Sequence, residues 1–148
     1  KEPGIKPFIS KMFDIYRSMA IYDWRYPGEY YSGVSRVAFF SQEGLRALTE
    51  LISEKDVPEA GRRLGKLMRS SMESSHRLDS SKRENWPDML KRLRIYGYGD
   101  IVLRGDIVVV RNPFIDNIDL LAGFLEELLG CKLNARTKTA PIVFELKP

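Results

Sequence analysis

Residues 96–110 read YGYGDIVLRGDIVVV, and this stretch predicts an antiparallel β-hairpin. Two runs rich in β-branched residues, Ile101–Leu103 and Ile107–Val110, flank a short glycine-containing turn. Such runs on either side of a turn are typical of two paired strands. Gly97 and Gly99 precede the first run and permit positive φ angles. Because a strand follows them rather than a helix, we interpret these glycines as a structural turn and not as a nucleotide-binding loop.

Helices and a further pair of strands are expected around this hairpin. Apolar residues at spacings of three and four, with capping residues before them, predict helices. The fold class is therefore α+β: an antiparallel sheet of about four strands, covered mainly on one face by helices. The expected helices are residues 42–53, a segment that begins after Asp56, a short one that Asn85 opens, and residues 115–129, and the closing strands are residues 132–137 and 142–146.

Packing of the central helices follows from their apolar residues. The helix over residues 42–53 and the next one are expected to form a helical hairpin, and the serine-rich residues 70–81 predict a frayed end or a mobile loop. The helix over residues 115–129 has an unusually wide apolar face, which indicates burial on more than one side, for example by a partner subunit. The expected inner residues are Leu45, Leu48, Leu51 and Ile52 in the first helix and Ala60, Leu64, Leu67 and Met68 in the second.

The N-terminal residues show a different pattern. Over residues 7–22, apolar side chains that include Phe8, Met12 and Phe13 predict an amphipathic helix, which needs a surface on which to lie. Residues 23–33 are expected to form an aromatic loop, and residues 36–40 a strand or an extended segment.

Composition limits the possible classes of protein. The 148 residues are 43% hydrophobic and 30% charged, as in one ordinary globular domain. No apolar run approaches the roughly 20 residues of a membrane span, and no signal-peptide pattern is present, so we expect a cytoplasmic protein. With one cysteine and one histidine, no intrachain disulfide, metal or cofactor is expected. Since the chain begins at Lys1, we expect a processed chain or a fragment of a longer protein.

The net charge of +4 is concentrated in residues 61–94, which include ten basic and four acidic residues. On a continuous helix, Arg62, Lys66 and Arg69 would share one face and could bind the phosphates of nucleic acid or of lipid head groups. A solvated helix face is the alternative. We favour it because no aromatic side chains alternate with the basic ones.

No combination of acid, base and nucleophile is evident, so no catalytic residue and no enzymatic activity are expected. Glu126 and Glu127 would point about 100° apart on a helix and face solvent. His76, three residues after Glu73, is interpreted as a surface histidine. Cys131 follows a helix C-terminus, where the helix dipole disfavours a thiolate, and is expected to be a packed thiol.

Several aromatic residues could instead line a pocket for an apolar ligand. Packing in a core or an interface explains them equally well. In a pocket, one or two tyrosine hydroxyls would provide the specificity. The candidate lining residues are Trp86, Tyr96, Tyr98, Phe114 and Phe124, together with Trp24 and Tyr26.

Short motifs follow one another in the second half of the chain: Ala60–Gly65, Trp86 ahead of Tyr96–Asp100, Asn112–Phe114, Leu121–Glu126 and Ile142–Glu145. In order and spacing they resemble the 4-vinyl reductase domain, a small-molecule-binding module related to subunits of the transport protein particle of vesicle trafficking. The resemblance covers about residues 35–148, which would form the ligand-binding domain. Residues 1–34 would add the amphipathic helix and the aromatic loop.

The resemblance implies a homodimer formed through helices, with an apolar pocket for aromatic or hydrocarbon ligands. Many such domains have a cysteine-rich zinc site near the last two strands, whereas residues 138–144 contain no cysteine and the start of the preceding helix has Phe114 and Ile115. The zinc site is therefore expected to be absent or replaced. Our leading hypothesis is a non-enzymatic sensory domain, for example one within a transcriptional regulator, that binds an apolar small molecule. A protein-interaction scaffold with a structural cavity is the second hypothesis. The third is nucleic-acid binding, through the basic residues or through a missing domain.

Overall fold

The computed structural model describes residues 5–19, 21–25, 29–32, 35–38 and 40–147. Contacts divide the chain into two compact units, residues 1–39 and residues 40–148, and each is described by itself. The resemblance placed a boundary after residue 34. In the structure, strand β3 (Ser35–Val37) pairs with a strand of the first unit and belongs to it.

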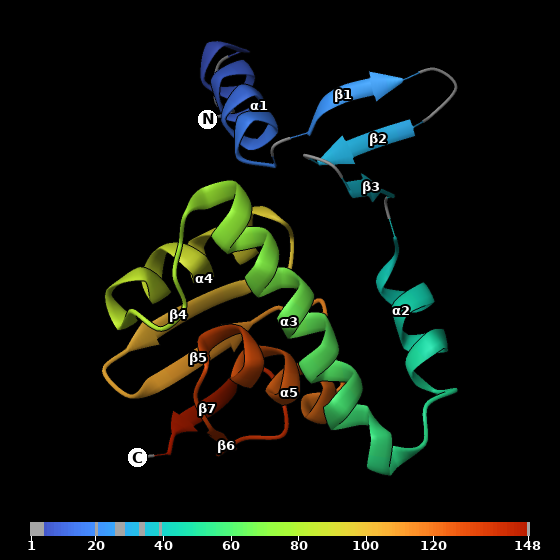
Figure 1. Cartoon of the computed structure of the whole chain (residues 1–148), viewed down its shortest axis with the longest axis vertical. Coiled ribbons are helices and arrows are strands. Elements are labelled where there is room, and N and C mark those ends of the chain that lie inside the picture. Colours follow the sequence, from blue (N-terminus) through green and yellow to red (C-terminus); the bar gives the residue numbers. More distant parts are fainter. Residues whose placement is uncertain (1–4, 20, 26–28, 33–34, 39, 148) are drawn as a thin grey trace. The chain divides into compact units, whose positions relative to one another are not determined.

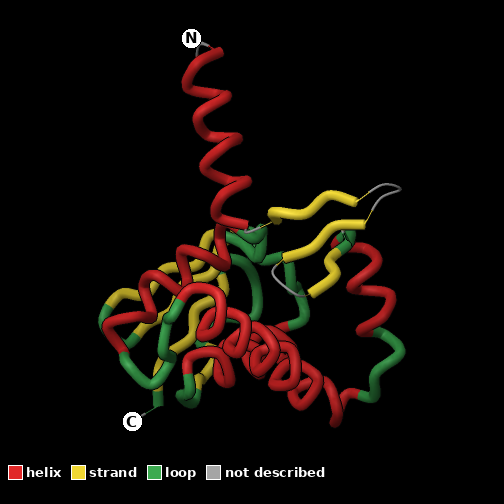
Figure 2. The backbone as a smooth tube through the Cα atoms, turned by 45° about the horizontal axis from the view of Figure 1, so that its top comes forward, coloured by secondary structure: helices red, strands yellow, loops and turns green. Residues whose placement is uncertain are grey.

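The first unit consists of a helix and an antiparallel three-stranded sheet. The expected amphipathic helix is confirmed as α1 (Ile5–Met19), which is one unbroken helix (Figure 2). Strands β1 (Ile21–Arg25), β2 (Glu29–Ser32) and β3 pair in that order. The expected aromatic loop is therefore wrong where the structure describes it, because residues 23–25 and 29–32 lie in two paired strands in which Trp24 is opposite Tyr30. Aromatic side chains favour strands over loops.

The second unit contains one four-stranded sheet and the helices that cover it. The predicted hairpin, the helix that follows Asn85 and the closing strands are all confirmed within a few residues. Helix α5 begins three residues later than expected, at Ile118, because the Asn117 side chain caps it by accepting the Leu120 N–H. The helical segments are α2 (Gln42–Thr49), η1 (Glu54–Asp56), α3 (Val57–His76), η2 (Arg83–Asn85), α4 (Trp86–Ile95) and α5 (Ile118–Leu129), and the strands are β4 (Asp100–Arg104), β5 (Ile107–Arg111), β6 (Leu133–Ala135) and β7 (Ile142–Leu146).

The sheet has the strand order β4-β5-β7-β6, and all its neighbouring strands are antiparallel. Ile101, Val110 and Ile142 lie side by side in the register and are buried, which identifies the face that points into the core. Helices α3, α4 and α5 lie on this side of the sheet (Figure 1), whereas α2 stands apart from the strands, and the predicted α+β class is confirmed. The opposite face has partly buried valines at Val102, Val109 and Val143.

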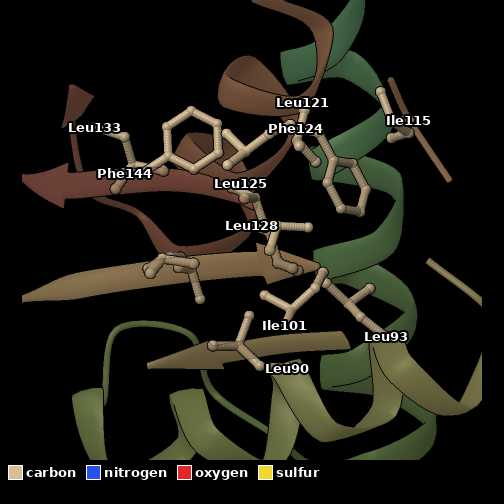
Figure 3. Close-up of a cluster of buried hydrophobic side chains, with 14 of the residues drawn as sticks. Leu90, Leu93, Ile101, Ile115, Leu121, Phe124, Leu125, Leu128, Leu133 and Phe144 are labelled. Atoms are coloured by element: carbon tan, nitrogen blue, oxygen red, sulfur yellow. The ribbon is translucent and has the colours of Figure 1, made fainter. Parts of the chain in front are cut away.

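The core lies between the sheet and the helices. Figure 3 shows Phe124, Leu125 and Leu128 of α5 close to Ile101 and Phe144 of the sheet, and all five are at most 3% exposed. The wide apolar face of α5 is explained by this position. One side of α5 packs toward the sheet, and α3 rather than a partner subunit covers another side.

Helices α3 and α5 lie side by side (Figures 1 and 2) and approach each other at glycines. Gly61 and Gly65 of α3 and Gly123 of α5 are buried. A Cβ atom at any of the three would overlap a backbone carbonyl oxygen of the other helix. Because α3 packs along α5, the expected hairpin of α2 and α3 is wrong.

The glycine contact also changes which residues of α3 face inward. Val57, Gly61, Gly65 and Met72 are buried, whereas Leu64 and Leu67 are 40% and 69% exposed. Of the predicted stripe, Ala60 and Met68 do pack against the core, whereas Leu64 and Leu67 do not, because glycines rather than leucines allow the close approach of the two helices. The expected fraying after residue 70 is also wrong, because the fully buried Met72 lies on a helix that continues to His76.

In α2 and the turn after it, the residues that face inward also differ from the predicted ones. Thr49 is buried and Leu45 and Ile52 are partly buried, whereas Leu48 and Leu51 are 54% and 83% exposed. The Thr49 hydroxyl donates to the Leu45 carbonyl at 2.8 Å, so this polar side chain is satisfied within its own helix. The inner face of α2 is thus narrower and more polar than the leucine pattern predicted.

Candidate functional site

Tyr98, Phe114 and Phe124 form an aromatic cluster beside the core. The ring centroids of Tyr98 and Phe124 are 5.2 Å apart with nearly parallel planes, and those of Tyr98 and Phe114 are 6.2 Å apart at an interplanar angle of 73°. These are the favourable stacked and edge-to-face arrangements of aromatic pairs. Phe124 is buried, whereas Tyr98 and Phe114 are partly exposed. Three of the seven predicted pocket residues are therefore brought together.

The backbone around Tyr98 explains this placement. Gly97 and Gly99 have φ angles of 87° and 122°, and a Cβ atom on Gly99 would lie 2.9 Å from the Asn112 carbonyl oxygen. The Phe114 N–H donates to the Tyr98 carbonyl at 3.1 Å. Both glycines provide the positive φ angles of the turn, and the missing side chain of Gly99 lets the chain pass close to the segment before α5, which places Tyr98 beside Phe114.

The Tyr98 phenol combines burial with an unused hydroxyl. Burial raises the pKa of Tyr98 above its ordinary value of 10.0, so the phenol is neutral at physiological pH. Within the described ranges, the hydroxyl forms no hydrogen bond, and its oxygen is not sealed from solvent. It can therefore donate to a polar atom of a molecule bound at the cluster.

Helix α2 is bound to the segment that contains Phe114. The Gln42 side-chain amide donates to the carbonyls of Pro113 and Phe114 at 3.0 and 3.1 Å. One turn later, the Arg46 guanidinium donates to the Asp116 carboxylate at 2.9 Å. A displacement of the Phe114 segment would therefore be transmitted to α2.

A pocket of about 440 Å³ lies beside these contacts, between α2, η1 and the start of α5. Its volume is sufficient for a small molecule. Six of its eight lining residues are polar or charged, and Ile52 and Val57 add apolar surface, so the walls are mixed and differ from the aromatic cavity that we predicted. Sequence reasoning missed it because its residues come from segments about 70 positions apart, and nothing in either segment indicates their contact. The lining residues are Arg46, Thr49, Glu50, Ile52, Glu54, Val57, Asp116 and Asn117.

Two predicted pocket residues have other partners. Trp86 is 7% exposed, its indole N–H donates to the Ser80 carbonyl at 2.8 Å, and the Arg83 guanidinium lies 5.5 Å from the ring centroid. It is a core residue that also fixes the loop before α4. The Tyr96 hydroxyl lies 2.7 Å from Nε2 of His76.

His76 is half-buried, so the prediction of a simple surface histidine needs correction. The Arg92 guanidinium lies 3.5 Å from the same Nε2 atom that contacts Tyr96. Burial first, and then the positive charge of Arg92, lowers the pKa of His76 below 6.5. His76, Tyr96 and Arg92 form a small polar cluster where α3 and α4 end.

The remaining two pocket candidates belong to the first unit. Tyr26 lies outside the described residues, and of Trp24 only the backbone pairing in β1 is described. Their roles in ligand binding stay predictions.

The predicted basic face is partly neutralised by carboxylates. Arg62 donates to Glu59 at 2.9 Å, and Arg69 pairs with Glu127, while Lys66 is exposed. Pairing of this kind reduces the charge available to phosphates. Glu127 therefore does not simply face solvent as expected.

Glu126 is also half-buried, which corrects the expectation that it faces solvent. Its carboxylate accepts the Leu133 N–H at 2.9 Å and lies 3.3 Å from the Lys132 ammonium. Glu126 thereby fixes the turn between α5 and β6.

Cys131 is half-buried, which confirms the packed thiol. Burial, with a smaller effect of Glu126, raises its pKa to about 11, so the thiolate is scarce at neutral pH. In the described part of the chain, no three side chains of the histidine, cysteine, aspartate and glutamate types gather as a metal site. None of the described helices is long and apolar enough to cross a membrane.

Comparisons of this chain with protein-family models, with curated proteins and with solved structures found no match.

Proposed function

We propose that this chain is a cytoplasmic, non-enzymatic sensory module of the 4-vinyl reductase type, which binds an aromatic or hydrocarbon molecule at the Tyr98–Phe114–Phe124 cluster. The observation that supports this proposal is the cluster itself, in which two partly exposed rings adjoin a buried one. An apolar ligand would stack on these rings, and burial of its surface would favour binding by about 25 cal/mol per Å². The free Tyr98 hydroxyl would select ligands with a polar atom.

In this proposal, ligand binding at the cluster changes the protein surface through a series of contacts. A ligand that displaces Phe114 moves the Pro113–Asp116 segment, and Gln42 and Arg46 pass this movement to α2. Since Leu48 of α2 and Leu51 in the turn after it are exposed, the movement would change an apolar surface. In a homodimer, it would bias the geometry that an output domain of a transcriptional regulator senses.

Calorimetric titration with phenol and with toluene tests the ligand site. We expect affinities on the order of micromolar for both. Phe114→Ala should weaken both by roughly tenfold or more, because a stacking surface is lost. Tyr98→Phe should weaken phenol by about fivefold and leave toluene unchanged, since only the hydroxyl is removed.

Tyr96→Phe is the matched control, because this tyrosine contacts His76 instead of the cluster. Trp86→Ala is unsuitable, since a residue so buried would destabilise the whole fold when truncated. If neither probe binds, or if Tyr96→Phe reproduces the effect of Tyr98→Phe, the cluster is not the ligand site.

A protein-interaction scaffold is the second candidate. It is favoured by exposed leucines on α2, in the turn after α2 and on α3, namely Leu48, Leu51, Leu64 and Leu67. Native and denaturing mass spectra of the freshly purified protein separate the two functions. A dimer with a releasable small molecule supports the sensory module, a dimer without one supports the scaffold, and a monomer contradicts the dimer in both.

A further inference from the structure

Helix α1 exposes an apolar face. Its five described apolar side chains are between 45% and 78% exposed, including the two phenylalanines at 58% and 64%. Aromatic and aliphatic surface of this extent on a single helix is unfavourable in water. The face requires a partner surface. The five residues are Ile5, Phe8, Ile9, Met12 and Phe13.

The arrangement of these residues indicates the shape of that partner. At about 100° per residue, the five side chains occupy a continuous sector of roughly 140°. A two-stranded coiled coil uses a narrower seam of two positions per heptad. The 15 residues of α1 also provide only about two heptads, which is too short for a stable isolated pair. A broad, flat apolar surface fits this sector better than a second copy of the helix.

The positions of the charged residues of α1 favour a partner surface with negative charge. The helix contains Lys6, Lys11 and Arg17 against Asp14, a net charge of +2. Lys6 and Arg17 are exposed and project within about 40° of Phe13, at the edge of the apolar sector. Asp14 projects roughly opposite the centre of that sector. Cations at the border can reach lipid phosphates while the apolar face is buried, and the carboxylate points away from the surface.

We propose that α1 binds the surface of an anionic lipid bilayer, lying in the interface with Phe8 and Phe13 inserted among the acyl chains and Lys6 and Arg17 at the phosphates. The helix lies on the membrane and does not span it. This inference uses the first unit alone and does not depend on a ligand at the aromatic cluster.

Co-flotation of the full chain with lipid vesicles tests the proposal. Vesicles of phosphatidylcholine with about 30% phosphatidylserine provide the anionic surface, and phosphatidylcholine alone is the neutral comparison. We expect binding to the anionic vesicles that weakens as salt rises. The double variant Lys6→Gln with Arg17→Gln should lose roughly 25-fold in affinity, at about fivefold per cation. Phe8→Ser with Phe13→Ser should lose roughly tenfold or more on the same vesicles.

Helix α3 provides matched controls, because Leu64, Leu67, Arg63 and Lys66 are also exposed. Leu64→Ser with Leu67→Ser, and Arg63→Gln with Lys66→Gln, should leave vesicle binding unchanged. The proposal is overturned if the wild-type chain floats with neither vesicle, or if the α3 variants lose binding while the α1 variants keep it. It is also overturned if the α1 phenylalanine variant changes the oligomeric mass but not vesicle binding, which would assign the face to a second copy. The salt titration of the wild-type chain tests it without any variant.

Discussion

The surroundings of His76 differ from those that the sequence predicted, because Tyr96 and Arg92 both contact its ring. The Arg92 guanidinium can only donate, so its approach to Nε2 favours the tautomer in which this nitrogen accepts from the Tyr96 hydroxyl. Protonation of His76 would remove that acceptor and place two positive charges side by side. The folded state therefore prefers neutral His76, in agreement with its lowered pKa.

The lowered pKa predicts how stability depends on pH. The unfolded chain binds the proton at about pH 6.5, whereas the folded chain binds it only at lower pH. The contribution of His76 to stability is thus present above pH 6.5 and is lost as pH falls from 6.5 through the folded pKa. Urea unfolding at pH 7.5 and pH 5.5 should show a larger loss for the wild type than for His76→Gln. Equal losses in the two proteins would contradict this assignment.

At the scale of elements, the contact of α3 with α5 depends on residues that have no side chain. Gly61, Gly65 and Gly123 allow backbone-to-backbone contact, and Arg69 pairs with Glu127 on the same two helices. The glycines are therefore structural, although they belong to the segments on which the family resemblance rests.

Gly65→Ala is predicted to destabilise the second unit. The added Cβ atom would overlap the Phe124 carbonyl, and the helices must move apart. Overpacking should lower the free energy of unfolding by about 2 kcal/mol, even though alanine improves helix propensity by about 1 kcal/mol. Ser70→Ala, at an exposed position of the same helix, should stay within about 0.5 kcal/mol of the wild type. Denaturant unfolding measures both, and an unchanged Gly65→Ala protein would show that the helices adjust without cost.

At the scale of the whole molecule, the second unit contains its own core. Every buried hydrophobic residue that the structure describes lies between Val57 and Phe144, and these residues form one cluster. The sheet, α3, α4 and α5 all contribute to it. The second unit is therefore expected to fold independently.

A chain of residues 40–148 should unfold cooperatively, with a melting temperature within about 5 °C of that of the full chain. Thermal unfolding followed by circular dichroism measures this. The full chain is the control, and a broad transition without a baseline would show that the first unit is required for the fold.

Most elements of the second unit could be predicted from the sequence. The hairpin at residues 100–111, the apolar helix α5 and the closing strands follow from local signals: β-branched runs, a glycine turn and helical periodicity. Of the candidate site, the sequence supplied Tyr98, Phe114 and Phe124, because aromatic residues stand out in composition. Local chemistry is sufficient for such predictions.

The surfaces that meet could not be predicted from the sequence, because they depend on how whole elements pack. Apolarity favoured Leu64 and Leu67 as inner residues of α3, but a close helix contact needs the absence of a side chain, so Gly61 and Gly65 face inward. Likewise, Trp86 joins the core and Tyr96 contacts His76, while the pocket beside α2 is lined by Arg46 and Asp116, which are distant in the chain. The reason is physical: periodicity gives the direction of a side chain on its own element, whereas its partner depends on how whole elements pack.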